Sequence, residues 1–151
     1  MAVGAHAMTN AAAPVCSWGS SSPALYFQWT VEEARPFIYM GTNYRYFTAP
    51  SAGNDNVYRC YTFIVPGSEQ TSINTSQCYI NKTELATQST VATSAQAAKS
   101  VWYIGSGGTS NYLTGKLSWF AVYNRVLTEA EIFSNVDYAS ALLASRSIGP
   151  F

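Results

Sequence analysis

The fold is decided by residues 115–132, which read Gly115-Lys116-Leu117-Ser118-Trp119-Phe120-Ala121-Val122-Tyr123-Asn124-Arg125-Val126-Leu127-Thr128-Glu129-Ala130-Glu131-Ile132. The first part predicts a glycine-led strand that stops at Asn124-Arg125. A helix start follows, because Thr128 and Glu131 have the spacing of a capping box, in which the hydroxyl and the carboxylate each accept a hydrogen bond from a backbone amide. We expect the helix to run to about Arg146, since apolar residues recur along one face: Ile132, Val136, Ala139 and Leu143.

The same segment resembles the closing strand of the laminin-G-like, concanavalin A-type jelly rolls, which typically reads Gly-x-Ile-x-x-Val-x-Ile-Tyr-Asn-Arg-x-Leu-Ser/Thr-x-x-Glu-Ile. The apolar positions of that pattern are filled by Leu117, Phe120 and Val122. The direct matches are Tyr123, Asn124, Arg125, Leu127, Thr128, Glu131 and Ile132. The resemblance covers about residues 57–132 and implies an all-β fold: an antiparallel β-sandwich of the jelly-roll type with a short C-terminal helix. It implies no particular activity, because such folds host many functions.

Two further stretches carry the resemblance. Tyr79-Ile80-Asn81 matches a strand-and-turn pattern after which the family usually has glycine, whereas Lys82 stands here. Glycine at such a position commonly serves a turn with positive φ, so we expect the turn to differ locally. Val101-Trp102-Tyr103-Ile104-Gly105 matches the family strand that precedes a glycine-rich loop, here residues 106–111.

The rest of the chain is organised around these segments. Aromatic and β-branched residues predict further strands at 25–31, 37–40, 44–48, 57–65 and 77–81. Residues 86–100 fit either a loop or a poorly paired strand, and a full jelly roll needs more chain, so some strands are absent or come from a neighbour. Residues 1–24 show no periodicity and predict an N-terminal arm. We therefore divide the chain into the arm (1–24), a jelly-roll β-sandwich (25–128), and a C-terminal helix and tail (129–151).

The three cysteines, Cys16, Cys60 and Cys78, are too few for a disulfide scaffold. If strands 57–65 and 77–81 form a hairpin centred near Glu69, Cys60 and Cys78 fall opposite each other. Paired antiparallel residues lie about 4.5–5.5 Å apart, which is within disulfide range. Two states stay open, a disulfide and free buried thiols that pack as small hydrophobic groups, and we favour the second.

The composition limits the partners of this protein. Charged residues make up 11% of the chain, with eight basic and eight acidic side chains, against about 25% in an average soluble domain. So little charge favours a surface covered by partners, although a Ser-, Thr- and Tyr-rich β protein that is merely low in charge fits equally well. We expect no nucleic acid, because there is no basic stripe. We also expect no membrane, because no apolar run approaches ~20 residues, and no signal peptide.

The sequence carries no recognisable catalytic or metal site. Glycoside hydrolases need a pair of carboxylates, but Glu129 and Glu131 fit the helix start, and Glu32 and Glu33 would point to opposite faces of a strand. Asn54-Asp55-Asn56 is the one oxygen-rich cluster, and we interpret it as an Asx turn rather than a calcium site. We therefore predict a non-enzymatic protein with no cofactor and no metal.

The candidate binding residues are aromatic: Trp119, Tyr112, Trp29, Tyr44 and Tyr46. Trp119 stands where relatives of this fold commonly carry a polar residue that faces solvent. It indicates either a surface covered by a partner or a contact with the C-terminal helix of the same chain. Aromatic platforms also suit sugars, although aromatic residues in strands more often belong to the core.

Two functions fit these observations. The first is a structural protein of a virion, a capsid decoration or fibre component that contacts capsid or other virion proteins and forms a homo-oligomer. The low charge, the predicted arm, the lack of a secretion signal and the C-terminal extension favour it. The second is a lectin-like carbohydrate-binding module that attaches to surface glycans. The two hypotheses differ in whether the surface aromatic residues are buried by protein or left open.

Overall fold

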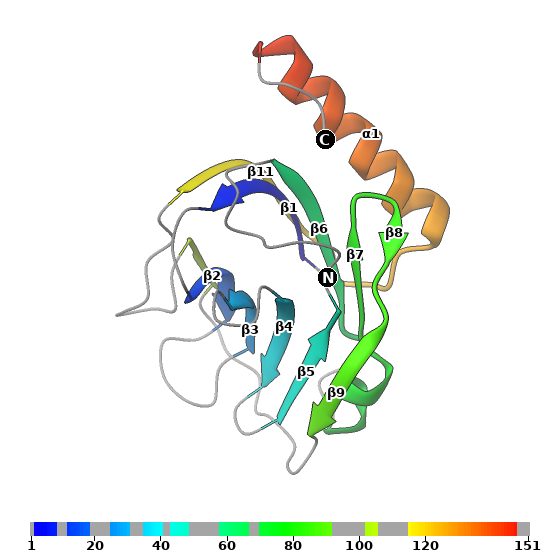
Figure 1. Cartoon of the computed structure of the whole chain (residues 1–151). Coiled ribbons are helices and arrows are strands. Elements are labelled where there is room, and N and C mark those ends of the chain that lie inside the picture. Colours follow the sequence, from blue (N-terminus) through cyan, green and yellow to red (C-terminus); the bar gives the residue numbers. More distant parts are fainter. Residues whose placement is uncertain are drawn as a thin grey trace.

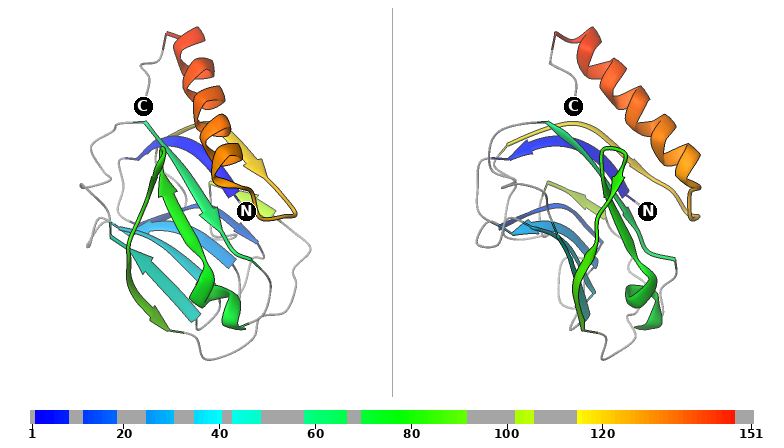
Figure 2. Two further views of the ribbon diagram at one scale, coloured as in Figure 1. Left: turned by 90° about the vertical axis from the view of Figure 1, so that its right-hand side faces the viewer. Right: turned by 45° about the vertical axis from the view of Figure 1, so that its right-hand side comes forward.

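The computed structural model describes residues 2–8, 12–18, 25–30, 35–40, 43–48, 58–66, 70–91, 102–105 and 115–147. Two antiparallel sheets form the layers of a β-sandwich, and a C-terminal helix lies against the outer face of one layer (Figure 1). Figure 2 shows the same arrangement from two further directions. The predicted fold, an all-β sandwich with a C-terminal helix, is confirmed.

The five-stranded sheet is the layer that carries the helix. Its strands, in spatial order, are β11 (Gly115–Val122), β1 (Ala2–Met8), β6 (Arg59–Ile64), β7 (Gln77–Ile80) and β8 (Thr83–Glu84). A 3-10 helix, η1 (Gln70–Thr75), lies between β6 and β7. β1 pairs with both β11 and β6, so Ala5 stands between Trp119 and Cys60 in the ladder.

The six-stranded sheet is the other layer. Its strands, in spatial order, are β10 (Trp102–Ile104), β2 (Ala12–Trp18), β3 (Leu25–Thr30), β4 (Arg35–Met40), β5 (Asn43–Phe47) and β9 (Thr87–Val91). The strands predicted at 25–31, 37–40, 44–48 and 101–105 are confirmed with small changes at their ends. β9 settles the open alternative for residues 87–91, which form a paired strand.

The prediction of an N-terminal arm over residues 1–24 is wrong for 2–8 and 12–18, which form β1 and β2. β1 pairs with two neighbours, yet its sequence, Ala-Val-Gly-Ala-His-Ala-Met, has few of the β-branched and aromatic residues that identify strands locally. Pairing on both sides supplies the stability that this local sequence lacks. The two strands also supply, from the same chain, some of the strands that the sequence left as either absent or contributed by a neighbour.

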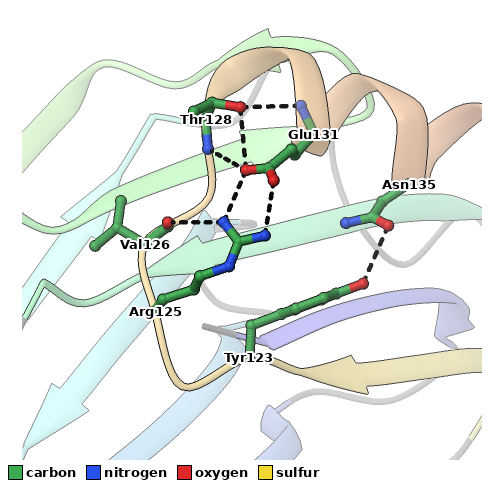
Figure 3. Close-up of polar contacts among 6 residues, drawn as sticks. All are labelled: Tyr123, Arg125, Val126, Thr128, Glu131 and Asn135. Carbon is green, nitrogen blue, oxygen red and sulfur yellow. Dashed lines mark hydrogen bonds and ion pairs between the residues drawn. The ribbon is translucent and has the colours of Figure 1, made fainter.

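The helix α1 (Glu129–Ser145) begins with the predicted cap. Glu131 N donates to Thr128 Oγ1 at 3.3 Å, and Thr128 N donates to the Glu131 carboxylate at 2.9 Å. Arg125 donates two hydrogen bonds to the same carboxylate, at 2.9 and 2.7 Å (Figure 3). These bonds, that from Arg125 foremost, lower the pKa of Glu131 to about 2. The cap therefore ties the end of β11 to the start of α1.

The predicted apolar face of α1 is the face that packs on the five-stranded sheet. Its buried residues are Ile132, Val136, Ala139 and Leu143. Side chains of the sheet and of the helix segment form two hydrophobic clusters where the two meet. One contains Ile64, Tyr79, Leu127 and Ile132, and the other contains Cys60 and Val136. In the part of the chain that the structure describes, no helix is both long and apolar enough to cross a membrane.

The β6–β7 hairpin forms as predicted, but its register differs by three residues. Cys78 pairs with Phe63, whereas Cys60 meets Asn81, whose backbone N donates to Cys60 O at 2.8 Å and whose Oδ1 accepts from Cys60 N at 2.9 Å. The six residues of η1 follow Glu69 and precede β7. The centre of the hairpin therefore moves from Glu69 toward β7. An odd shift sends residues to opposite faces of the sheet. The predicted pairing of the two cysteines is therefore wrong, and the favoured state, free and buried thiols, is confirmed.

In the β7–β8 turn the residue with positive φ is Asn81 and not Lys82, the residue that stands where the family usually has glycine. Ile80 pairs with Thr83, so Asn81 and Lys82 form the loop. Asn81 has a φ of 55°, in the left-handed region that asparagine tolerates better than most residues with a side chain. The turn therefore forms without a glycine at position 82. The Lys82 ammonium lies 2.6 Å from the Asp137 carboxylate and links the turn to α1.

Candidate functional site

An aromatic surface lies on the β4–β5 hairpin. Tyr44 and Tyr46, two of the predicted binding residues, alternate along β5, and both are half-buried. Their ring centroids lie 5.0 Å apart in an edge-on arrangement, and the Tyr46 ring lies 5.1 Å from that of Phe37, its ladder partner on β4. Tyr39, also half-buried, is the ladder partner of Tyr44. These four residues, Phe37, Tyr39, Tyr44 and Tyr46, are called the aromatic surface below, although Phe37 itself is only 8% exposed and serves as the buried support of the Tyr46 ring.

Arg45 shows which way the aromatic surface faces. Successive residues of a strand point to opposite faces of the sheet, and Arg45 lies between Tyr44 and Tyr46. Arg45 Nη1 donates to the carbonyl oxygen of Ile73 at 3.1 Å and to that of Asn74. Both carbonyls belong to η1, which connects two strands of the five-stranded sheet (Figure 1). Arg45 therefore points toward the opposite layer, and the aromatic surface faces outward.

The same arginine holds β5 in place beneath the aromatic surface. Arg45 Nε donates to Thr87 Oγ1 on β9 at 3.1 Å, and the guanidinium lies 5.7 Å from the centroid of the Phe47 ring. Desolvation lowers the pKa of Arg45, against the attraction of Glu84, and the group stays charged at neutral pH. Ile38 and Phe47 are 0% and 1% exposed. A charged anchor and a packed core thus support the half-buried rings of Tyr44 and Tyr46, which limits the freedom they lose when a ligand binds.

Two predicted binding residues do not take part in this arrangement. Trp29 belongs to β3 and pairs with Pro36, whereas Gln28 pairs with Phe37. Because successive residues of a strand alternate between the two faces, the ladder position of Trp29 is not on the face to which Phe37 belongs. The side chain of Trp29 is not among those that the structure describes. Tyr112 also lies outside the described residues.

Trp119 belongs to the other layer and packs against α1. Its ring centroid lies 6.0 Å from that of Tyr138 in an edge-on arrangement, and it contacts the Cys60–Val136 cluster. Of the two interpretations left open by the sequence, the contact with the helix of the same chain is the one observed. Tyr138 itself remains 59% exposed.

Sequence reasoning overlooked Phe37 and Tyr39 as site residues. The signal was present, because Phe37-x-Tyr39 and Tyr44-x-Tyr46 lie close together in the sequence, on two strands that pair up to Met40 and Asn43. Alternating aromatic residues on both sides of a hairpin turn lie on one face once the strands pair. The exact register decides which residues meet, and the local pattern leaves that register open.

The carboxylates of the described residues lie away from the aromatic surface. Glu84, on β8, accepts hydrogen bonds from Gln77 Nε2 at 2.8 Å and from Tyr79 OH at 3.3 Å, and burial together with the Glu84 charge raises the pKa of Tyr79. The others belong to α1: Glu129, Glu131 and Asp137. No group of three His, Cys, Asp or Glu side chains in the described ranges is placed to hold a metal ion. Residues 54–56 lie outside those ranges.

Comparison with known families agrees with this architecture. A family model described as the concanavalin A-like lectin/glucanases superfamily matches residues 5–133. The match includes most of β1 and all of β2, which places these strands in the same domain as the rest. Among curated proteins no match was found. Because the family model spans most of the chain, the protein belongs to the concanavalin A-like lectin/glucanase superfamily.

Proposed function

We propose that this protein is a non-catalytic carbohydrate-binding module that attaches to glycans through the aromatic surface of its six-stranded sheet. One observation carries the proposal: the half-buried residues Tyr44 and Tyr46, whose rings contact each other, face away from the sandwich core, and the Tyr46 ring also contacts Phe37. Tyrosine rings combine a large apolar face with a polar hydroxyl. Sugars present the complementary surface, with apolar C–H faces and hydroxyl groups at the rim.

The electrostatics of the surface support binding rather than catalysis. The ladder partners on β4 and β5 are uncharged apart from Arg45, which points to the other layer. Hydrolysis of a glycosidic bond uses two carboxyl groups on either side of that bond. None of the carboxylates in the described part of the chain belongs to β4, β5 or β9. The proposed module therefore holds a glycan and leaves it intact.

The test is a glycan array with the wild-type protein, followed by calorimetric titration of the best ligand. Tyr46→Ala and Tyr44→Ala should each weaken binding about tenfold or more, since a stacked ring contributes on the order of 1.4 kcal/mol. Tyr138→Ala is the matched control, because Tyr138 is an exposed tyrosine on α1, away from the six-stranded sheet. Equal affinities for all four proteins, or binding to no glycan, would contradict the proposal. Release of reducing ends from the bound glycan would contradict its non-catalytic part.

A second candidate function is a structural role in a virion, as a homo-oligomeric capsid decoration or fibre component bound to other virion proteins. The low content of charged residues, 11%, favours it. Large apolar side chains that remain exposed favour it as well: Ile104, Val122, Val126 and Tyr138. Trp119 no longer supports it, because that ring packs on α1 of the same chain. Light scattering of the protein, alone and mixed with the particle it came from, tests this role, and a monomer that does not dock argues against it.

A further inference from the structure

One ladder row of tyrosines crosses the six-stranded sheet at right angles to its strands. Tyr103 on β10 pairs with Ser17 on β2, and Ser17 pairs with Tyr26 on β3. Tyr26 pairs with Tyr39 on β4, and Tyr39 pairs with Tyr44 on β5. Residues that are directly opposite in adjacent strands share one face of a sheet. The register therefore places Tyr103, Tyr26, Tyr39 and Tyr44 on the face of the aromatic surface.

The row is long. From β10 to β5 it crosses four strand spacings of about 4.8 Å, or about 19 Å in total. The described side chains in it belong to Tyr39, Tyr44 and Tyr103, and all three residues are half-buried rather than enclosed in the core. A single sugar ring stacked on Tyr44 covers only one end of the row. A chain of sugars that crosses the strands can reach both ends.

The row and its neighbour are also uncharged. The adjoining row contains Pro14, Gln28, Phe37, Tyr46 and Ser89 in ladder order. Neither row contains an acidic or basic residue. Arg35, which pairs with Thr30 at the end of the β3–β4 ladder, takes the next position on this face, two residues from Phe37. It is four residues from Tyr39 and therefore about 13 Å along the strand from the tyrosine row. Binding of an anionic polymer to this face would lack the cations that such ligands need along their length.

Building on the proposed function, we infer that the ligand is an extended, uncharged polysaccharide that lies across the strands of the six-stranded sheet, with its ends near Tyr44 and Tyr103. Stacking on Tyr44, Tyr39 and Tyr103 supplies the affinity. Tyr26, Gln28 and Ser89 occupy ladder positions in or beside the row. Affinity therefore grows with chain length until the glycan spans the row. Short oligosaccharides bind at the Tyr39–Tyr44 end, where the rings of the aromatic surface gather.

The experiment titrates the protein with cello-, xylo- and manno-oligosaccharides of one to six units, and with alginate oligosaccharides as charged counterparts. In the neutral series that binds, affinity should rise about tenfold or more from the disaccharide to the hexasaccharide, and it should not fall with added salt. Tyr103→Ala should weaken hexasaccharide binding severalfold and leave disaccharide binding unchanged, whereas Tyr44→Ala should weaken both. Tyr103→Phe keeps the ring and should retain most of the affinity. Circular dichroism and thermal melts confirm that each variant folds.

The outcomes separate this inference from the function on which it rests. Length-independent affinity, a Tyr103→Ala variant that binds the hexasaccharide like the wild type, or a preference for alginate would overturn the inference and leave the carbohydrate-binding function standing. Binding of the wild type to no glycan, in these series or on the array, would overturn both. A loss of hexasaccharide binding in Tyr103→Ala that appears equally in disaccharide binding would also overturn the inference, because it would place Tyr103 within a short site.

Discussion

We predict that one substitution in the core, Thr62→Val, increases the stability of the protein. Thr62 lies in β6, the strand between β1 and β7, with Val3 and Tyr79 as its ladder partners. Its side chain is 0% exposed, and its Oγ1 has no hydrogen-bond partner among the described residues. Most core substitutions destabilise a protein by about 0.5–3 kcal/mol. Thr62→Val should instead stabilise this one.

The expected magnitude follows from the hydroxyl group. Leaving a buried polar group unsatisfied costs about 1–3 kcal/mol. Valine has the same β-branched shape and the same stiffness at χ1, so the substitution replaces the hydroxyl by a methyl group with little change in the strand. Because a methyl group is slightly larger than a hydroxyl group, part of the gain is offset by packing. We expect a net gain of about 1 kcal/mol, which raises the Tm of a domain of this size by roughly 2–4 °C.

The assay is urea denaturation followed by tryptophan fluorescence, with the midpoint and the slope fitted separately. Ser76→Ala is the matched control, because Ser76 is also 0% exposed but its hydroxyl donates to Ile73 O at 2.7 Å. Removing that bonded hydroxyl should cost about 1 kcal/mol. Opposite signs for the two substitutions support the reasoning. A Thr62→Val variant that is less stable than the wild type refutes it, since the hydroxyl must then have a partner that stabilises the fold.

Three further predictions concern the helix and the thiols. The pKa of Glu131 is lower in the folded protein than its ordinary value of 4.5, so the stabilisation by its carboxylate is fully present above pH 4.5 and is lost as the pH falls toward about 2. Glu131→Gln keeps the cap but should flatten the pH dependence of the free energy of unfolding in that window. Burial raises the pKa of the Cys60 thiol to about 12 and also raises that of Cys78, so iodoacetamide with mass spectrometry should label both only after unfolding, and a disulfide between them would contradict the register. Trp119 and Tyr138 should show a coupling of about 0.5–1.5 kcal/mol in a double-mutant cycle of unfolding free energies, whereas additive alanine substitutions would mean that their contact contributes nothing.

Much of the candidate site could have been predicted from the sequence, but not its geometry. Tyr44 and Tyr46 were identified from composition and strand position. Phe37 was not, although it contacts Tyr46, because only the pairing of β4 with β5 brings the two rings together. For Trp119 the sequence leaves two interpretations open, a surface covered by a partner and a contact with the C-terminal helix, and the structure shows the contact with Tyr138, 19 residues further on in α1. In each case the residue type indicated a role, and a contact between separate elements decided it.

By itself, the sequence determined the features that depend on neighbours a few residues apart. The cap of α1 joins residues three apart, and the buried face of the helix repeats every three or four residues, so both follow from local order. The tertiary structure alone decided that residues 2–8 form a central strand, and that Cys60 and Cys78 lie on opposite faces of the five-stranded sheet. It also decided that a row of tyrosines crosses the other sheet. The reason is physical: a helix satisfies its backbone hydrogen bonds within one segment, whereas a strand obtains them from distant segments, and a shift of one residue in that pairing exchanges the two faces of a strand.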